Sequence, residues 1–160
     1  MDLNTVERRS LSDPTFRPVA AAMRVLAPHF TDPWELWAET GVGNPGSALI
    51  SILFRNTEDS RIAPPSAIEL HVYPTVIEIP KVLLPDHLRH QALMYRTLQQ
   101  VVHVGEEDGQ HVVISQCVNR YKRSLLARGA MQTPNVYDAV VLNPDMDFGL
   151  SKLSSSPPLR

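Results

Sequence analysis

Three apolar, strand-like runs between residues 47 and 79 constrain the fold of this chain more than any other feature of its sequence. Residues 47–55 (SALISILFR) are apolar and partly β-branched, which is typical of a largely buried strand. Residues 67–73 alternate apolar and polar side chains, and residues 76–79 (VIEI) indicate a third strand. Prolines bound these runs, where the missing backbone N–H of proline does least harm to a sheet. The sequence therefore predicts a sheet.

Two helices are predicted before the first strand. An Asp-Pro pair at residues 13–14 supplies a capping side chain and a fixed φ, and apolar residues at helical spacing follow it. This pattern predicts a helix over residues 14–27. A second Asp-Pro pair, at residues 32–33, is followed by a glutamate in the capping-box position and predicts a short helix over residues 33–39.

The region after the third strand begins as a helix and then allows two interpretations. Asp86 can cap a helix whose apolar stripe reaches Leu98. The stripe can continue through the valines that follow as one long helix. Alternatively, residues 100–104 and 110–118 form a β-hairpin around an acidic loop bounded by glycines. We favour the hairpin, because both arms are rich in valine.

The last elements predicted are a basic helix over residues 120–128, ended by Gly129, and a strand within residues 137–142 (YDAVVL). Together the patterns indicate an α+β fold: a single domain with a mainly antiparallel sheet of about five strands and three to four helices. The element order is similar in outline to that of small dimeric secretion chaperones, in architecture alone and without a shared motif.

Both ends of the chain are expected to lie outside the folded domain, which we place at residues 13–142. Residues 1–12 are interpreted as a flexible N-terminus. Residues 143–160 are interpreted as a mostly disordered tail, because their serines and prolines bury too little apolar surface to offset the entropy of ordering. Deleting residues 149–160 is expected to leave the melting temperature nearly unchanged.

Composition narrows the classes of partner. The chain has 15 basic and 17 acidic residues and a formal net charge of −2, so it has no overall attraction to nucleic acid or anionic lipid. Its single cysteine excludes an intrachain disulfide, and the first twelve residues lack the apolar core of a secretory signal. No apolar run approaches the ~18 residues of a membrane span. We expect a cytoplasmic protein, or one in a host cytoplasm if it comes from a virus or intracellular parasite.

Two patterns suggest a cofactor or metal, and neither is specific. Residues 41–46 (GVGNPG) match G-x-G-x-x-G, but the dinucleotide motif requires a strand before the loop and a helix after it, whereas here the reverse is predicted. His87 and His90 lie three residues apart, and His71 is the only third zinc ligand that can be named. We therefore expect no cofactor and no metal.

Cys117 is the candidate nucleophile. The predicted hairpin would bring it near His103 or His111, and the basic residues that follow it would favour a thiolate. No catalytic signature flanks it, however, and free cysteines are usually small buried hydrophobes. We expect Cys117 to be buried and slow to react, and we assign no catalytic residue.

Two groups of side chains are candidates for binding. Arg120, Lys122, Arg123 and Arg128 form a basic patch that could bind an anion or a nucleic-acid backbone. Trp34 and Trp37 would share one side of the short helix over 33–39, and two exposed indoles would be an anchor for a partner.

The functional hypothesis that follows is a non-catalytic protein-binding domain that self-associates, acting as an adaptor, a chaperone-like subunit or an assembly component. Its expected partner is another protein, a second copy of the chain, or both, and no membrane. Two alternatives stay open. One is a nucleic-acid- or phosphate-binding structural protein, viral or phage, that uses the basic helix. The other is a small enzyme with Cys117 as nucleophile.

Overall fold

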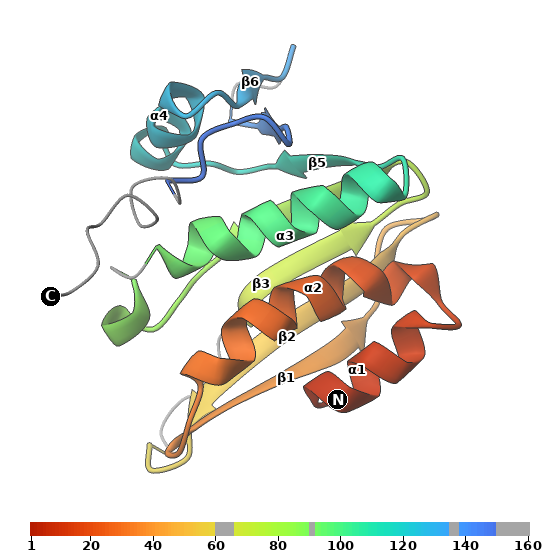
Figure 1. Cartoon of the computed structure of the whole chain (residues 1–160), viewed down its shortest axis with the longest axis vertical. Coiled ribbons are helices and arrows are strands. Elements are labelled where there is room, and N and C mark those ends of the chain that lie inside the picture. The colour runs from red at the N-terminus through yellow and green to blue at the C-terminus, as the bar shows by residue number, and fades with distance from the viewer. Residues whose placement is uncertain (60–65, 90–91, 135–137, 150–160) are drawn as a thin grey trace, which may run out of the picture.

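Seven strands form one sheet in the order β1-β2-β3-β4-β5-β7-β6 (Figure 1). The computed structural model describes residues 1–59, 66–89, 92–134 and 138–149. Within these ranges β4 and β5 are parallel and every other neighbouring pair is antiparallel. The strands are β1 (Trp34–Gly41), β2 (Ala48–Asn56), β3 (Ser66–Val72), β4 (Val76–Val82), β5 (His111–Ile114), β6 (Met131–Gln132) and β7 (Val140–Leu142).

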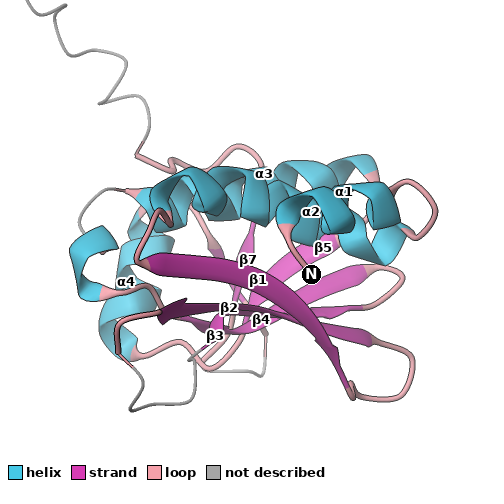
Figure 2. Cartoon of the chain, turned by 90° about the horizontal axis from the view of Figure 1, so that it is seen from below, coloured by secondary structure: helices cyan, strands magenta, loops and turns pink. Residues whose placement is uncertain are grey.

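Three α-helices form a layer on one face of this sheet, and a fourth lies at its end (Figure 2). The helices are α1 (Leu3–Ser10), α2 (Arg17–Leu26), α3 (Leu93–Glu107) and α4 (Asn119–Ala127), with short 3-10 turns at Pro14–Phe16, Ala27–His29 and Asp86–Leu88. The layer consists of α1, α2 and α3, whereas α4 lies beside α3, where the Tyr95 hydroxyl is 2.7 Å from that of Ser124. No described helix is both long and apolar enough to cross a membrane.

The core lies between the helix layer and the sheet. Alternate residues of the central strands point toward the helices, and Ile50, Ile52, Ile68 and Leu70 are fully buried there. Helix α2 presents small residues to this interface, since Ala20 to Ala22 are all buried, and small side chains allow a helix to approach the sheet closely. The three strand-like runs therefore form part of a sheet, as predicted, and one face of that sheet is fully packed.

The α+β fold with a mainly antiparallel sheet is confirmed, as are the helix beginning near residue 14, the three strands between residues 47 and 82, and the basic helix. Helix α4 ends as predicted at Gly129, whose φ is +102°. The Gly129 and Ala130 N–H groups donate to the carbonyls of Leu126 and Leu125, at 3.1 and 3.0 Å, which satisfies the end of the helix. The sheet has seven strands rather than about five.

The short helix predicted over residues 33–39 is wrong: these residues belong to β1. The Asp-Pro signal is local, and a helix of this length is marginal without packing on one apolar face. The residues instead alternate between the faces of the sheet, with Ala38 fully buried and its neighbour Glu39 exposed. Pairing with β2 along the whole of β1 outweighs the capping signal.

The hairpin favoured around residues 105–109 is also wrong, and the alternative of a helix continuing past Leu98 is correct. Asp86 does not cap this helix, which begins at Leu93, and residues 86–88 form a separate 3-10 turn. Helix α3 continues to Glu107, and β5 then runs parallel to β4. Val101 and Val102, two of the valines that suggested a strand, belong to α3 and are buried against the sheet. Gly105 marks a close approach: a Cβ there would lie 3.1 Å from the carbonyl oxygen of Gln110.

The two ends assigned outside the domain are partly folded onto it. Residues 3–10 form α1, which Asp2 caps by accepting a bond from the Thr5 N–H at 2.8 Å, and Val6 is fully buried. The described start of the tail, residues 143–149, places Met146 and Phe148 in the core. Residues 150–160 lie outside the described residues.

Candidate functional site

The face of the sheet opposite the helix layer is covered by no helix in the described parts of the chain (Figure 2). Strand alternation sends every second side chain to it. Its apolar members are half-buried rather than buried, which is expected where only neighbours in the same sheet shield them. They include Trp37, Leu49, Leu53, Val113 and Val141. We call these five side chains and the polar residues between them the uncovered face.

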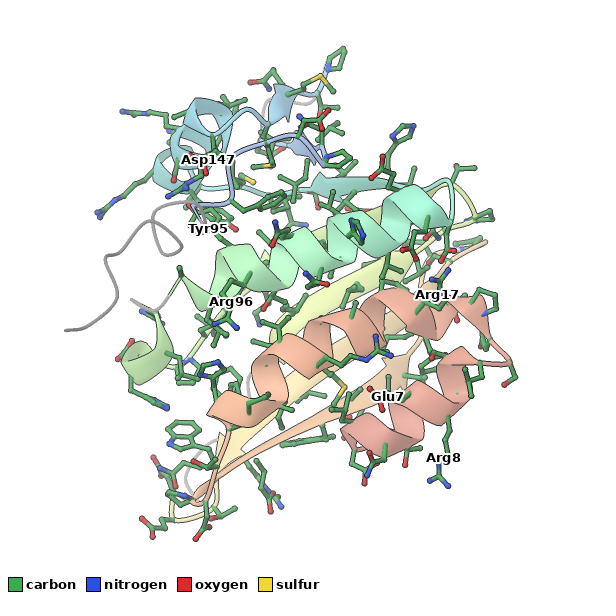
Figure 3. The ribbon with its side chains drawn as sticks, in the orientation of Figure 1. Glu7, Arg8, Arg17, Tyr95, Arg96 and Asp147 are labelled. Carbon is green, nitrogen blue, oxygen red and sulfur yellow. The ribbon has the colours of Figure 1, made fainter. Side chains whose placement is uncertain are left out.

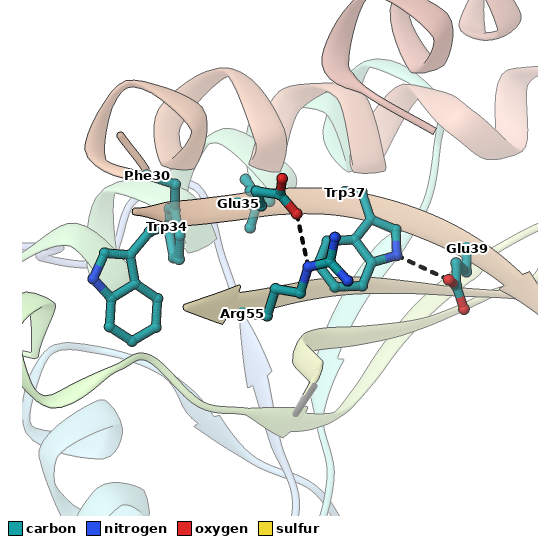
Figure 4. Close-up of a pocket in the computed structure, with 7 residues that line it drawn as sticks. Phe30, Trp34, Glu35, Trp37, Glu39 and Arg55 are labelled. Atoms are coloured by element: carbon teal, nitrogen blue, oxygen red, sulfur yellow. Dashed lines mark hydrogen bonds and ion pairs between the residues drawn. The ribbon is translucent and has the colours of Figure 1, made fainter. Parts of the chain in front are cut away.

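Polar residues of the uncovered face bind one another across the strands. Beside Trp37, the Arg55 guanidinium contacts the Glu35 carboxylate at 2.7 Å and lies 5.5 Å from the indole ring centre. The indole N–H donates to Glu39 at 2.8 Å (Figure 4). These contacts hold the Trp37 ring in place at the surface, so its apolar area is presented in one orientation.

A second polar group lies near the centre of the uncovered face. The Ser115 hydroxyl donates to a carboxylate oxygen of Glu78 at 2.8 Å. His71 is the cross-strand partner of Glu78 on one side and of Leu49 on the other. The Ser115 hydroxyl and the Glu78 carboxylate thus bond each other, whereas the Nδ1 atom of His71 is buried without a hydrogen-bond partner among the described residues.

The two tryptophans lie on opposite faces, because residues three apart on a strand point to opposite sides. Trp34 turns toward the helix side, where its ring centre lies 6.0 Å from that of Phe54 and 4.8 Å from that of His87. Trp37 turns to the uncovered face. The structure therefore separates the two predicted partner-binding residues, and only Trp37 belongs to the uncovered face.

A hollow of about 600 Å³ follows the outer edge of β1. It extends across both sides of the strand (Figure 4). Phe30, Trp34 and Leu36 contribute its apolar wall, and Glu35, Trp37, Glu39 and Arg55 contribute the other wall.

Cys117 is buried, as predicted, and lies beyond the end of β5. Burial raises the pKa of its thiol to about 11, the Asp138 carboxylate adds to this rise, and Lys122 opposes it. The thiol donates weakly to the carbonyl oxygen of Ile114, at 3.6 Å. Without the hairpin, His103 stands on α3, where it is 3.9 Å from Glu107. The described geometry thus keeps Cys117 protonated and provides it with no histidine base.

The four basic residues of the predicted anion site do not act as one patch. Arg120 and Arg123 are exposed on α4, but Lys122 is buried. The Arg128 guanidinium lies over the Tyr95 ring, 4.2 Å from its centre. Figure 3 shows Tyr95 and Asp147 on this side of the molecule. Only two of the four side chains therefore point freely into solvent.

The glycine-rich loop at residues 41–46 joins two antiparallel strands, so a strand enters it and a strand leaves it. Its glycines serve this hairpin: Gly46 has a φ of +80°, and a Cβ on Gly43 would lie 2.7 Å from the Ser47 hydroxyl. Of the histidines considered as zinc ligands, His87 stacks on Trp34, and His90 lies outside the described residues. The described residues contain no group of three or more potential ligands that could hold a metal ion.

Sequence reasoning missed the uncovered face. A signal for it was present in β2, where apolar Leu49 and Leu53 occupy the phase opposite to Ile50 and Ile52. That pattern was interpreted as a strand buried on both sides, which it would be if another layer covered it. Comparison with known proteins adds no candidate site, since no family model matches the chain and no curated protein matches its sequence.

Proposed function

We propose that this chain is a non-catalytic, self-associating protein-binding domain, of the adaptor, chaperone-like or assembly-subunit kind, and that the uncovered face is its binding surface. The observation that carries the proposal is the apolar content of that face. An antiparallel sheet that simply faces water alternates apolar and polar side chains cleanly. Here Trp37 and Leu53 are direct cross-strand partners on β1 and β2, and Leu49 lies on the same face of β2 beyond Ser51.

The chemistry of the uncovered face supports binding rather than turnover. Some of its charged groups contact one another, as Arg55 contacts Glu35, and its aromatic ring is held by Glu39. Ordered aromatic rings surrounded by polar contacts are the usual anchors of protein interfaces. Cys117, the nucleophile considered above, is buried with a raised pKa and supports no covalent mechanism.

A charge placed beside Trp37 on the uncovered face is the direct test. Leu53→Lys is expected to abolish self-association, because a lysine there would have to be desolvated in the interface. Light scattering of the wild type over a micromolar concentration series measures the assembly. Leu11→Lys is the matched control, since Leu11 is an exposed leucine after α1, remote in sequence from the sheet.

Melting temperatures of both variants show whether they remain folded. The proposal is wrong if the wild type stays monomeric across the series and no purified binding partner distinguishes Leu53→Lys from Leu11→Lys.

A further inference from the structure

β1 is an edge strand, with β2 on one side and no strand on the other in the described sheet. In an antiparallel pair, residues alternate between bonding the neighbouring strand and pointing their N–H and C=O groups away from it. Ala38 points away, because its N–H and C=O both bond Met1. Pro33 points toward β2, because its carbonyl accepts from the Thr57 N–H at 2.7 Å. Leu36 and Thr40 share the outward phase of Ala38.

Met1 shows that this edge accepts an antiparallel residue. Its amino group donates to the Ala38 carbonyl at 2.7 Å, and its carbonyl accepts from the Ala38 N–H at 2.8 Å. These two bonds are the pair that one residue of an added strand would make. Toward the start of β1, the Trp34 N–H donates to the Thr31 carbonyl at 2.9 Å. Between these two contacts, no described residue bonds the outward N–H and C=O of Leu36.

The hollow of about 600 Å³ lies along this part of the edge. A residue placed opposite Leu36 would direct its side chain to the helix side, where Phe30, Trp34 and Leu36 form an apolar wall. The residues before and after it would point to the other side, toward Glu35 and Glu39. The only basic group lining that side, Arg55, is already paired with Glu35.

We propose that β1 binds an extended partner segment by strand addition at Leu36, and that the segment alternates basic, apolar and basic side chains. The two free backbone groups of Leu36 provide the main-chain bonds, the apolar wall takes the central side chain, and the carboxylates of Glu35 and Glu39 favour the basic neighbours. This inference rests on the proposed protein-binding function and names the partner's chemistry.

The probes are two blocked seven-residue peptides, KLKLKLK and its acidic twin ELELELE, titrated into the full chain by calorimetry. Only a central K-L-K or E-L-E can pair at Leu36, because Met1 occupies the position opposite Ala38 and Thr31 accepts from the outward N–H of Trp34. KLKLKLK is expected to bind and ELELELE is not, and the difference should shrink as salt is raised. Equal affinity of the two peptides, or binding by neither, would overturn the proposal.

Proline substitution tests the edge without changing β2. Leu36→Pro removes an N–H that β2 does not use, and is expected to weaken KLKLKLK binding by about tenfold or more, as loss of a backbone bond and a steric block predict. Thr40→Pro, on the same edge beyond Met1, should change the affinity less than about twofold. Leu36→Ala removes the side chain but keeps the backbone N–H, so its affinity for KLKLKLK shows how much of the loss in Leu36→Pro is due to the side chain. Unchanged affinity in Leu36→Pro would overturn the proposal.

Amide exchange in the wild type decides the question even if Leu36→Pro does not fold. The Leu36 N–H is expected to exchange rapidly in the free chain and to become protected with KLKLKLK, whereas the Ala38 N–H is protected in both states by Met1. A Leu36 N–H that stays unprotected at saturating peptide would contradict strand addition. Should Leu53→Lys abolish partner binding while Leu36→Pro does not, the uncovered face binds partners and the edge does not.

Discussion

The two faces of the sheet differ in how deeply their side chains are buried, although the same strands contribute to both. On β2, Ile50 and Ile52 point toward the helix layer and are fully buried, whereas Leu49 and Leu53, one residue away, remain half-buried on the uncovered face. The covered face packs against α2 and α3 mainly through apolar side chains. The uncovered face mixes apolar groups with ion pairs. The difference indicates that stability resides mainly on the first face and that the second is available for a partner.

The tryptophans of β1 repeat this comparison with identical side chains. Trp34 packs on Phe54 within the helix side, and Trp37 lies on the uncovered face under the guanidinium of Arg55. A side chain that stabilises the fold and one that can bind a partner thus stand three residues apart.

The strongest test of the comparison is a pair of truncations on β2. Ile52→Ala should lower the free energy of unfolding by about 2–5 kcal/mol, because it removes buried methylene groups and leaves a cavity. Leu53→Ala should cost about 1 kcal/mol or less, since its side chain is already half in water. Denaturant titration measures both. Equal losses would show that the uncovered face is covered in solution.

A second pair of variants compares the tryptophans. Trp34→Ala should destabilise the fold by about 2 kcal/mol through loss of aromatic packing and buried area. Trp37→Ala should cost about 1 kcal/mol or less and should weaken self-association instead. Thermal melting and light scattering of the same samples separate the two effects. If Trp37→Ala unfolds the chain and Trp34→Ala does not, the assignment of faces is reversed.

The smallest expected effect is on the free energy of unfolding at alkaline pH, through Cys117 and Tyr121. Burial raises the pKa of Cys117 to about 11 and raises that of Tyr121 as well, so the unfolded chain loses these protons first as pH rises. The contribution of Cys117 to stability is therefore full below pH 9 and is lost as pH rises through 11, and that of Tyr121 is lost at higher pH. Cys117→Ala should flatten part of this alkaline decline in denaturant titrations. Rapid labelling of the native thiol at pH 8 would contradict the burial of Cys117.

How much the sequence predicted depended on whether a pattern was local or shared between elements. The helix beginning near Pro14, the three central strands and the Gly129 helix end were predicted, because each depends on capping, periodicity or a residue that tolerates positive φ. The valines at 101 and 102 were assigned to a strand because β-branched composition was weighed above the helical stripe that precedes them. Both residues are in fact part of α3 and are buried against the sheet.

The candidate site was predicted only in part. Trp37 was named as a partner-binding residue, but for a helix it does not form, and Trp34 was named with it although it packs on the helix side. The basic helix was located, yet the burial of Lys122 could not be read from a run of basic residues. The edge of β1 was not predicted, because it depends on which strand lies outermost and on where the distant Met1 comes to rest.

The sequence by itself determined that this chain has an α+β core, since apolar periodicity sets which residues must leave water, whatever their order in space. Only the tertiary structure decided which strands are neighbours, that the helices gather on one face, and that β1 stands at the edge, where no described residue bonds the outward backbone groups of Leu36. The physical reason is that a face is uncovered, or an edge is free, when no other segment packs against it, and this depends on where the rest of the chain lies. The apolar pattern of that segment is the same whether a neighbour covers it or a partner is still to bind.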